Sequence, residues 1–105
     1  MSDIRGGRPT FGTCENCGLP VEGRRAIDED QVLLQPGEFP AHRIPEQARW
    51  HLANGIAWPG NDTAWCRLDH AEVCPAGPEP EHRALRELHR RLALRARIAQ
   101  DRRSR

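Results

Sequence analysis

Short runs of hydrophobic residues, separated by proline, glycine and charged residues, occur along the chain before residue 75, a spacing that is typical of short β-strands. The run at 31–35 precedes a Pro-Gly pair, which predicts a strand that stops at the proline. Residues 22–30 are mostly charged and predict an exposed connection. Residues 38–47 contain two further prolines and predict an extended loop, which Phe39 and Ile44 would anchor to the core.

A β-hairpin is the clearest local prediction. The short runs 49–53 and 56–58 flank the Asn-Gly pair at 54–55, and this pair accepts positive φ at both positions of a two-residue turn. The resulting register places Trp50 and Leu52 on one face and Trp58 on the other, with Trp50 more buried. A further short strand is expected to begin at residues 65–66.

A helical repeat follows the proline-rich segment 75–80. Residues 81–102 repeat apolar side chains every three or four positions, which predicts one amphipathic helix roughly 30 Å long. Glu79 and Glu81 stand at the start of this segment and Arg102 and Arg103 at its end, as the helix dipole favours. Leu94 and Ile98 lie off its narrow apolar stripe, which consists of Leu85, Leu88, Leu92, Ala96 and Ala99.

The composition limits the core that these elements can build. Hydrophobic residues make up 37% of the 105 residues and aromatic residues 5%, while glycine and proline contribute nine residues each. Such a chain is expected to need a metal ion or disulfides as an additional constraint. No apolar run approaches the roughly 18 residues of a membrane-spanning helix, and the first residues lack the apolar segment of a signal peptide. A cytoplasmic location is therefore expected.

Four cysteines, arranged in two groups along the sequence, indicate a metal-binding site. Cys14 and Cys17 form a C-x2-C pair followed by glycine, and Cys66 and Cys74 enclose His70 in a C-x3-H-x3-C pattern. The C-x2-C spacing lets two thiolates converge on one ion, and the glycine permits the tight turn. Because disulfides are uncommon in the cytoplasm, the pattern predicts a structural Zn²⁺ site. A redox dithiol, which would need a βαβ context, and unlinked thiols are the alternatives.

The sequence leaves the full ligand set open. Closed four-cysteine sites are common structural zinc sites, so the favoured set is Cys14, Cys17, Cys66 and Cys74. In the alternative set His70 replaces one of the two later cysteines. His51 lies on a predicted strand, where packing is the simpler interpretation. The histidines expected to face solvent are His42, His82 and His89.

Together these elements predict an α+β fold, in which a small zinc-bound antiparallel β unit similar to a zinc ribbon precedes one long C-terminal α-helix. The expected divisions are a flexible lead at 1–10, a zinc-binding β domain at 11–76, a proline-rich hinge at 77–80 and the helix at 81–102. Residues 1–78 carry seven Arg and 11 acidic residues (net −4), whereas residues 79–105 carry nine Arg and four acidic residues (net +5). The hinge and the change of charge predict a helix partly detached from the β domain.

The combined pattern resembles one known family. The residues that carry the resemblance are the C-x2-C-G motif, Pro36-x-Glu38-x-Pro40, Ile44-Pro45, Arg49-Trp50-His51 with Gly55-Ile56-Ala57, and Cys66-Arg67-Leu68-x-His70-x2-Val73-Cys74-Pro75. They are similar to a family of small actinobacterial proteins classified as a domain of unknown function. The resemblance covers about residues 13–76 and leaves the helix outside. It implies a bacterial, cytoplasmic setting and a Cys/His metal module, without a known activity.

The favoured function is a structural-zinc binding module that contacts a protein, such as transcription machinery, or a nucleic acid. The contacts are assigned to the helix, at Arg83, Arg86, Leu88, Arg90 and Arg97. A protein that assembles into a homodimer through the helix is the alternative. A zinc-dependent hydrolase is disfavoured, because H-E-x-x-H and the deaminase signature are absent and the chain is small for a deep pocket. Such an enzyme would use Cys14, Cys17 and one later cysteine, with Glu72 as the base; no catalytic residue is assigned.

Overall fold

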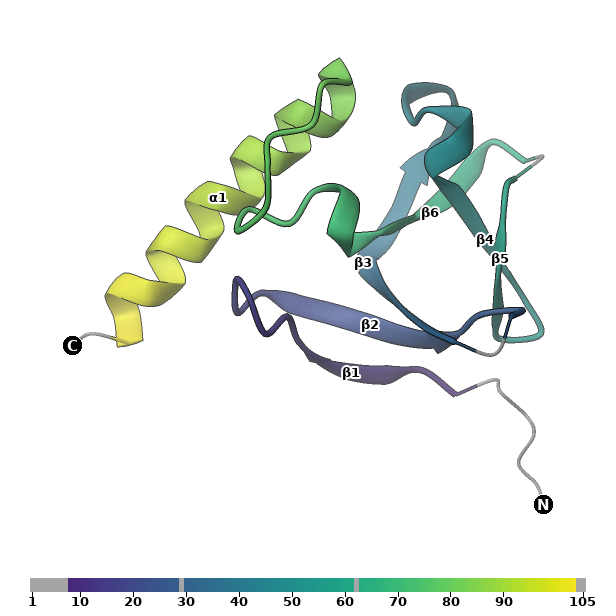
Figure 1. Cartoon of the computed structure of the whole chain (residues 1–105), viewed down its shortest axis with the longest axis horizontal. Helices are drawn as coiled ribbons and strands as arrows, with labels where there is room; N and C mark the ends of the chain where they lie inside the picture. The colour runs from purple at the N-terminus through teal and green to yellow at the C-terminus, as the bar shows by residue number, and fades with distance from the viewer. Residues whose placement is uncertain (1–7, 29, 62, 104–105) are drawn as a thin grey trace.

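The structure, a computed structural model, describes residues 8–28, 30–61 and 63–103. It consists of one antiparallel six-stranded sheet, in the order β1-β2-β3-β6-β4-β5, and one long helix, α1 (Arg83–Arg103), beside the sheet (Figure 1). The strands are β1 (Thr10–Thr13), β2 (Pro20–Arg25), β3 (Gln31–Pro40), β4 (Arg49–Ala53), β5 (Ile56–Pro59) and β6 (Trp65–Asp69). The short 3-10 turns are η1 (Ala41–Arg43), η2 (Glu46–Ala48) and η3 (His70–Glu72). The predicted α+β class, a β unit followed by one C-terminal helix, is confirmed.

The β4–β5 hairpin forms in the predicted register. Ala53 pairs with Ile56 and Leu52 with Ala57, and the turn residues Asn54 and Gly55 have φ values of 55° and 78°. Trp50 and Leu52 pack against the buried Ala57 on one face of the ribbon. On the other face Trp58 is 38% exposed, so the prediction that Trp50 is the more buried tryptophan is confirmed.

Replacing Gly55 with valine should lower the free energy of unfolding by about 1–3 kcal/mol, because a β-branched side chain is strained at positive φ. Ala53→Val is the matched control, since it places the same side chain on an exposed strand position. The control should change stability by no more than about 0.5 kcal/mol. Urea denaturation of the two variants checks this, and equal stabilities would contradict the role of the turn.

Strand β3 is twice as long as the sequence suggests, and the predicted end of the strand at Pro36 is wrong. β3 pairs with β6 on both sides of an irregularity between Gln35 and Phe39. The Arg67 side chain, which comes from β6 opposite this bulge, donates a hydrogen bond from Nε to the Gly37 carbonyl over 2.9 Å. The bulge at the Pro-Gly pair leaves the Gly37 carbonyl without a backbone partner in the β3–β6 pairing, and the Arg67 side chain supplies the missing hydrogen bond.

The charged stretch at 22–30, predicted as an exposed connection, contributes to β2. Glu22 is buried, and its two carboxylate oxygens accept hydrogen bonds from Arg67 over 2.7 Å and from Arg24 over 2.8 Å. Burial alone would raise the pKa of Glu22, but the two guanidinium groups lower it below its usual value. Glu22 is therefore a charged residue inside the sheet, with a cation supplied from β6, two strands away.

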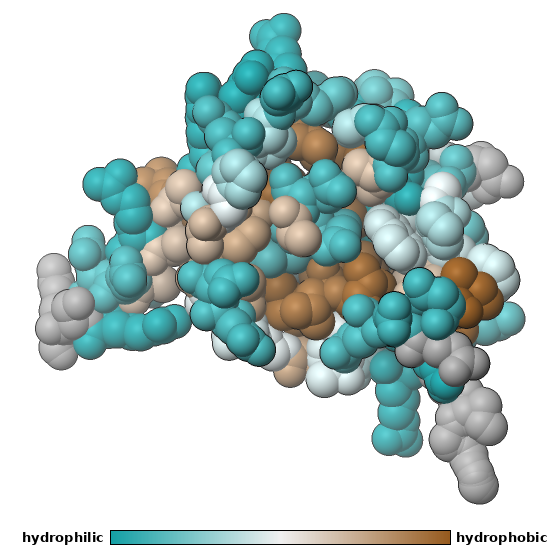
Figure 2. All heavy atoms as spheres, in the orientation of Figure 1, coloured by the Kyte–Doolittle hydropathy of each residue, from teal (hydrophilic) through white to brown (hydrophobic). Residues whose placement is uncertain are grey.

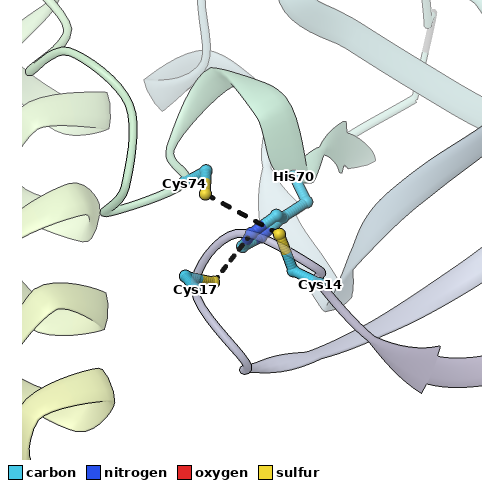
Figure 3. A group of neighbouring side chains, drawn as sticks. All are labelled: Cys14, Cys17, His70 and Cys74. Atoms are coloured by element: carbon cyan, nitrogen blue, oxygen red, sulfur yellow. Dashed lines mark hydrogen bonds between the residues drawn. The ribbon is translucent and has the colours of Figure 1, made fainter.

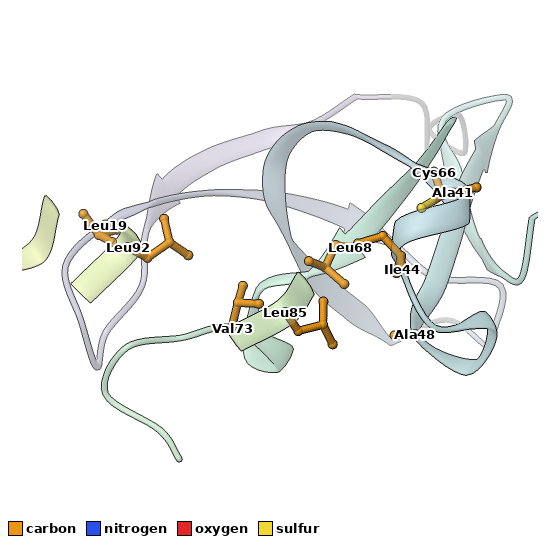
Figure 4. Close-up of a cluster of buried hydrophobic side chains, with 9 residues drawn as sticks. All are labelled: Leu19, Ala41, Ile44, Ala48, Cys66, Leu68, Val73, Leu85 and Leu92. Atoms are coloured by element: carbon orange, nitrogen blue, oxygen red, sulfur yellow. The ribbon is translucent and has the colours of Figure 1, made fainter. Parts of the chain in front are cut away.

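The helix α1 completes the main hydrophobic core. Its Leu85 and Leu92 are buried among side chains of the β unit that include Leu19, Leu68 and Val73 (Figure 4). Leu88 and Ala96 pack against the same cluster, which also contains the predicted anchors Ile44 and, at its edge, Phe39. Leu94 and Ile98 are 59% and 46% exposed, as their position off the stripe predicts.

The prediction of a partly detached helix is therefore wrong. The proline-rich segment does separate the helix from β6 in sequence, but it turns the chain so that α1 returns to the sheet (Figure 1). Within the ranges that the structure describes, no helix combines the length and the hydrophobicity of a membrane-spanning segment.

Candidate metal centre

Three cysteines and one histidine converge at the end of the sheet near α1. One ligand atom from each of Cys14, Cys17, His70 and Cys74 lies within 4.8 Å of all the others (Figure 3). The Sγ atoms of Cys14 and Cys74 are 3.8 Å apart, and Cys17 Sγ is 3.4 Å from His70 Nε2. Cys14, His70 and Cys74 are buried and Cys17 is half-buried. This group can hold a metal ion.

The first two ligands come from a tight loop, residues 14–19, that joins β1 to β2. The Gly18 amide donates to the Cys14 carbonyl and the Cys14 amide donates to the Leu19 carbonyl, each over 2.8 Å. Gly18 has φ 78°, and a β-carbon there would lie 3.0 Å from Nη2 of Arg103 in the last turn of α1. The positive φ of the loop favours glycine at this position, whereas the guanidinium of Arg103 ends a flexible, exposed side chain that can move aside.

The other two ligands follow β6. The strand ends at Asp69, whose Oδ1 accepts a hydrogen bond from the Ala71 amide over 2.9 Å and so caps η3. His70 opens η3, and Cys74 comes just after the turn, whose Val73 amide donates to the His70 carbonyl over 2.9 Å. One turn of helix therefore brings residues 70 and 74 to the same side of the chain, opposite the loop at 14–19 (Figure 3).

Gln35 on β3 holds the imidazole in place. Its Oε1 lies 2.8 Å from His70 Nδ1, and both side chains are buried. Because a carbonyl oxygen only accepts, Nδ1 carries the proton and Nε2 turns an unprotonated lone pair toward Cys17. Burial lowers the pKa of His70, which keeps the ring neutral as a metal ligand requires. Sequence reasoning missed Gln35, whose only signal is that it is the polar residue at the end of an apolar run.

The thiols of the group differ in acidity. Burial, together with the neighbouring Cys14 and Cys74 side chains, raises the pKa of Cys17 to about 12. Burial also acts against ionisation of Cys14, but amide hydrogen bonds from Cys17 and Asn16 lower its pKa below the usual value. Without a cation, neighbouring thiolates in so small a volume would repel one another. A bound divalent cation removes this repulsion and deprotonates coordinating thiols.

Substituting Gln35 with leucine should weaken metal binding by about 10- to 100-fold, because the partner that fixes the metal-bound histidine is lost. Gln35→Glu keeps an acceptor oxygen at the same position and should bind the metal more tightly than the leucine variant. Competition for Co²⁺ against a chromophoric chelator measures both affinities. Equal affinities for the wild type and the leucine variant would show that Gln35 does not position the ligand.

Cys66, part of the favoured four-cysteine set, is not brought to this group. Side chains alternate along β6, so Cys66 and Leu68 share the face that points into the main core, where Cys66 is 1% exposed. Burial raises the pKa of its thiol. The fourth ligand is His70, the alternative that the sequence offered. η3, the turn that follows β6, reaches the metal centre, whereas β6 itself does not.

The remaining histidines lie apart from the group. His51 on β4 contacts the Gly60 carbonyl through Nδ1 over 2.9 Å, consistent with a packing role. His42 and His82 are exposed, as predicted, and His89 is half-buried with Nε2 3.3 Å from the Gly77 carbonyl.

The helix residues assigned to partner contact lie in three different environments. Leu88 points inward and packs against the core, so it belongs to the fold. Three of the arginines already have partners within the chain. Arg83 Nε lies 3.8 Å from Glu87 Oε2, and Arg90 Nε lies 3.1 Å from Glu79 Oε2. Arg86 Nη1 donates to the Glu81 carbonyl over 3.3 Å. Arg97 is exposed and lines a shallow groove of about 320 Å³ beside Cys17.

Comparison with known proteins identifies one family. A family model described as "Family of unknown function (DUF6083)" matches residues 4–101. The match includes the metal group and most of α1, whereas the resemblance detected in the sequence was limited to about 13–76 and left the helix outside. No curated protein and no solved structure matches the chain.

Proposed function

The chain belongs to this family of unknown function, and we propose that it is a binding module built around a structural zinc ion. Cys14, Cys17, His70 and Cys74 bind the ion, and arginines on the exposed side of α1 contact a protein or a nucleic acid. The observation that carries the proposal is the convergence of four ligand atoms within 4.8 Å of one another.

The interatomic distances support zinc. In a tetrahedral site with Zn–S bonds of about 2.3 Å and Zn–N bonds of about 2.0 Å, two sulfurs lie about 3.8 Å apart and a sulfur and a nitrogen about 3.5 Å apart. The corresponding distances here are 3.8 Å and 3.4 Å. Three cysteines and one histidine are a common ligand set of structural zinc. Four protein ligands fill a tetrahedron and leave no position for a reacting water, which favours a structural role over a hydrolase.

The positive charge on the exposed side of α1 supports the proposal of an anionic partner. Helical spacing places Arg91, Arg95 and Arg102 on one side of α1, next to Leu94 and Ile98. These five residues, all exposed, form the outer surface of α1. No ion pair to its three arginines is found within the described residues. The apolar stripe of α1, with Leu85 and Leu92, is buried against the β unit and is not available for dimerisation.

Metal analysis tests the first half of the proposal. Protein purified under reducing conditions should contain one zinc ion per chain, and Co²⁺ substitution should produce the intense thiolate-to-metal absorption of a cysteine-rich site. A zinc content far below one per chain, in protein that is folded, would contradict it.

Charge reversal tests the second half. Arg91→Glu with Arg95→Glu should weaken binding of a 20-base-pair duplex DNA, and the affinity of the wild type should fall steeply with salt as counterions are released. The matched control reverses two exposed arginines of the β unit, Arg25 and Arg43. If duplex and single-stranded nucleic acids do not bind, the same pair of variants is compared for capture of a protein partner. Equal behaviour of variant and control in both measurements would contradict a role for the outer surface of α1.

A further inference from the structure

A groove of about 540 Å³ lies between the first part of β3 and η3. Ala26, Val32 and Trp50 give it apolar walls, and Cys14, His70 and Cys74 of the metal group line its other end. Figure 2 shows hydrophobic atoms gathered in the middle of this face of the molecule, with hydrophilic side chains around them. The volume is within the range of ligand-binding clefts. We call this space the β3 groove.

One side of the β3 groove is an unpaired strand edge. Residues 31–33 of β3 pair with β2, in the register Gly23↔Leu33 to Arg25↔Gln31. On the other side, pairing with β6 stops at Leu34↔Asp69, and none of the described strands continues beside residues 31–33. In Figure 1 this first part of β3 runs beside β2. A strand edge without a paired neighbour can accept an added strand.

The charge of the β3 groove is negative. Its lining contains Asp28, Asp30 and Asp69, and it contains no arginine. One oxygen of Asp28 accepts a hydrogen bond from the Asp30 amide, and one oxygen of Asp69 accepts a hydrogen bond from the Ala71 amide. No ion pair to any of the three carboxylates occurs within residues 8–28, 30–61 and 63–103. A cation is therefore the complementary charge.

We propose that the β3 groove binds an extended, arginine-containing segment of a partner protein. The segment adds as a short strand to residues 31–33, and an arginine side chain lies between Asp28, Asp30 and the half-buried Trp50. A planar guanidinium fits because it pairs with carboxylates and also stacks on an indole ring. The carboxylates exclude a nucleic acid from this groove, which distinguishes it from the outer surface of α1. This inference goes beyond the proposed function and does not depend on the α1 contact.

A pair of short peptides tests the proposal on the full chain loaded with zinc. The probe is acetyl-Val-Arg-Val-Arg-Val-amide, and its control carries citrulline, which is uncharged and nearly isosteric, at both arginines. We expect the arginine peptide to shift the backbone amide signals of residues 31–33 and the indole signal of Trp50 in heteronuclear NMR spectra. Citrulline should weaken this binding, and methylation of alternate peptide nitrogens should weaken it as well because it removes strand hydrogen bonds.

Charge variants locate the site. Asp28→Asn with Asp30→Asn should weaken the arginine peptide about tenfold, since two exposed ion pairs are lost. The matched control, Glu46→Gln with Asp101→Asn, removes the same charge at exposed positions outside the groove lining and should bind as the wild type does. The proposal is overturned if the peptide shifts α1 signals instead, if citrulline binds equally well, if both charge variants behave alike, or if no signal shifts at millimolar peptide.

Discussion

Replacing Cys14 with serine should abolish cooperative folding of this chain. The residue pairs that approach across the metal group are separated by 60 and 53 positions in the sequence, so one ion closes most of the β unit. Binding of zinc to such a site contributes on the order of 10 kcal/mol of apparent folding free energy. A domain of this size is expected to have no more than roughly that much net stability. The thermal transition of the variant, followed by circular dichroism, should broaden or disappear, and a strong chelator should have the same effect on the wild type.

Cys66→Ala is the control that distinguishes the two ligand sets. Cys66 lies in the hydrophobic core, outside the metal group, so its loss should reduce stability moderately while zinc content stays at one per chain. His70→Ala should instead lose the metal. The opposite result, a zinc-loaded His70 variant and a metal-free Cys66 variant, would support the four-cysteine set and refute the geometry described above.

Truncation of Leu92 to alanine should destabilise the protein by about 2–5 kcal/mol, because a fully buried side chain leaves a cavity. Leu94→Ala, two residues further along α1, is the matched control. Leu94 is 59% exposed, so its truncation should change the unfolding free energy by only about 0.5 kcal/mol. Chemical denaturation with urea measures both values.

The same pair of variants reports on how α1 is attached. Similar small losses for Leu92→Ala and Leu94→Ala would mean that the helix stands away from the sheet in solution. A large loss at Leu92 alone means that α1 belongs to the folding unit. In that case a chain shortened before residue 79 should not form a stable domain, although both halves of the metal group precede the cut.

Local features were predicted from the sequence with good detail. The register of the β4–β5 hairpin follows from one Asn-Gly pair, because positive φ at both turn residues fixes which residues face each other. The buried and exposed leucines of α1 follow from helical spacing alone. The C-x2-C-G loop was also predicted, since its conformation depends on adjacent residues.

Features that depend on distant partners were not predicted. Glu22 looked exposed because the sequence does not show that Arg67, two strands away, would neutralise it. The Pro-Gly pair after Gln35 looked like a strand end because the bulge is satisfied by that same arginine. The choice between Cys66 and His70 depended on where β6 ends: Cys66 lies within the strand and points into the core, whereas His70 is the first residue after the strand and lies in the turn.

The bridge from Arg67 to Glu22 and the Gly37 carbonyl has a consequence for how related sequences can diverge. Loss of Glu22 alone leaves the buried Arg67 guanidinium without its counter-charge, which typically costs about 3–5 kcal/mol, whereas loss of Arg67 leaves Glu22 paired with Arg24 only. Replacing both together with apolar side chains of similar volume is far less damaging. Homologues should therefore change positions 22 and 67 in concert. A sequence in which position 67 alone has changed should keep a cation at position 24, whose side chain already contacts the same carboxylate.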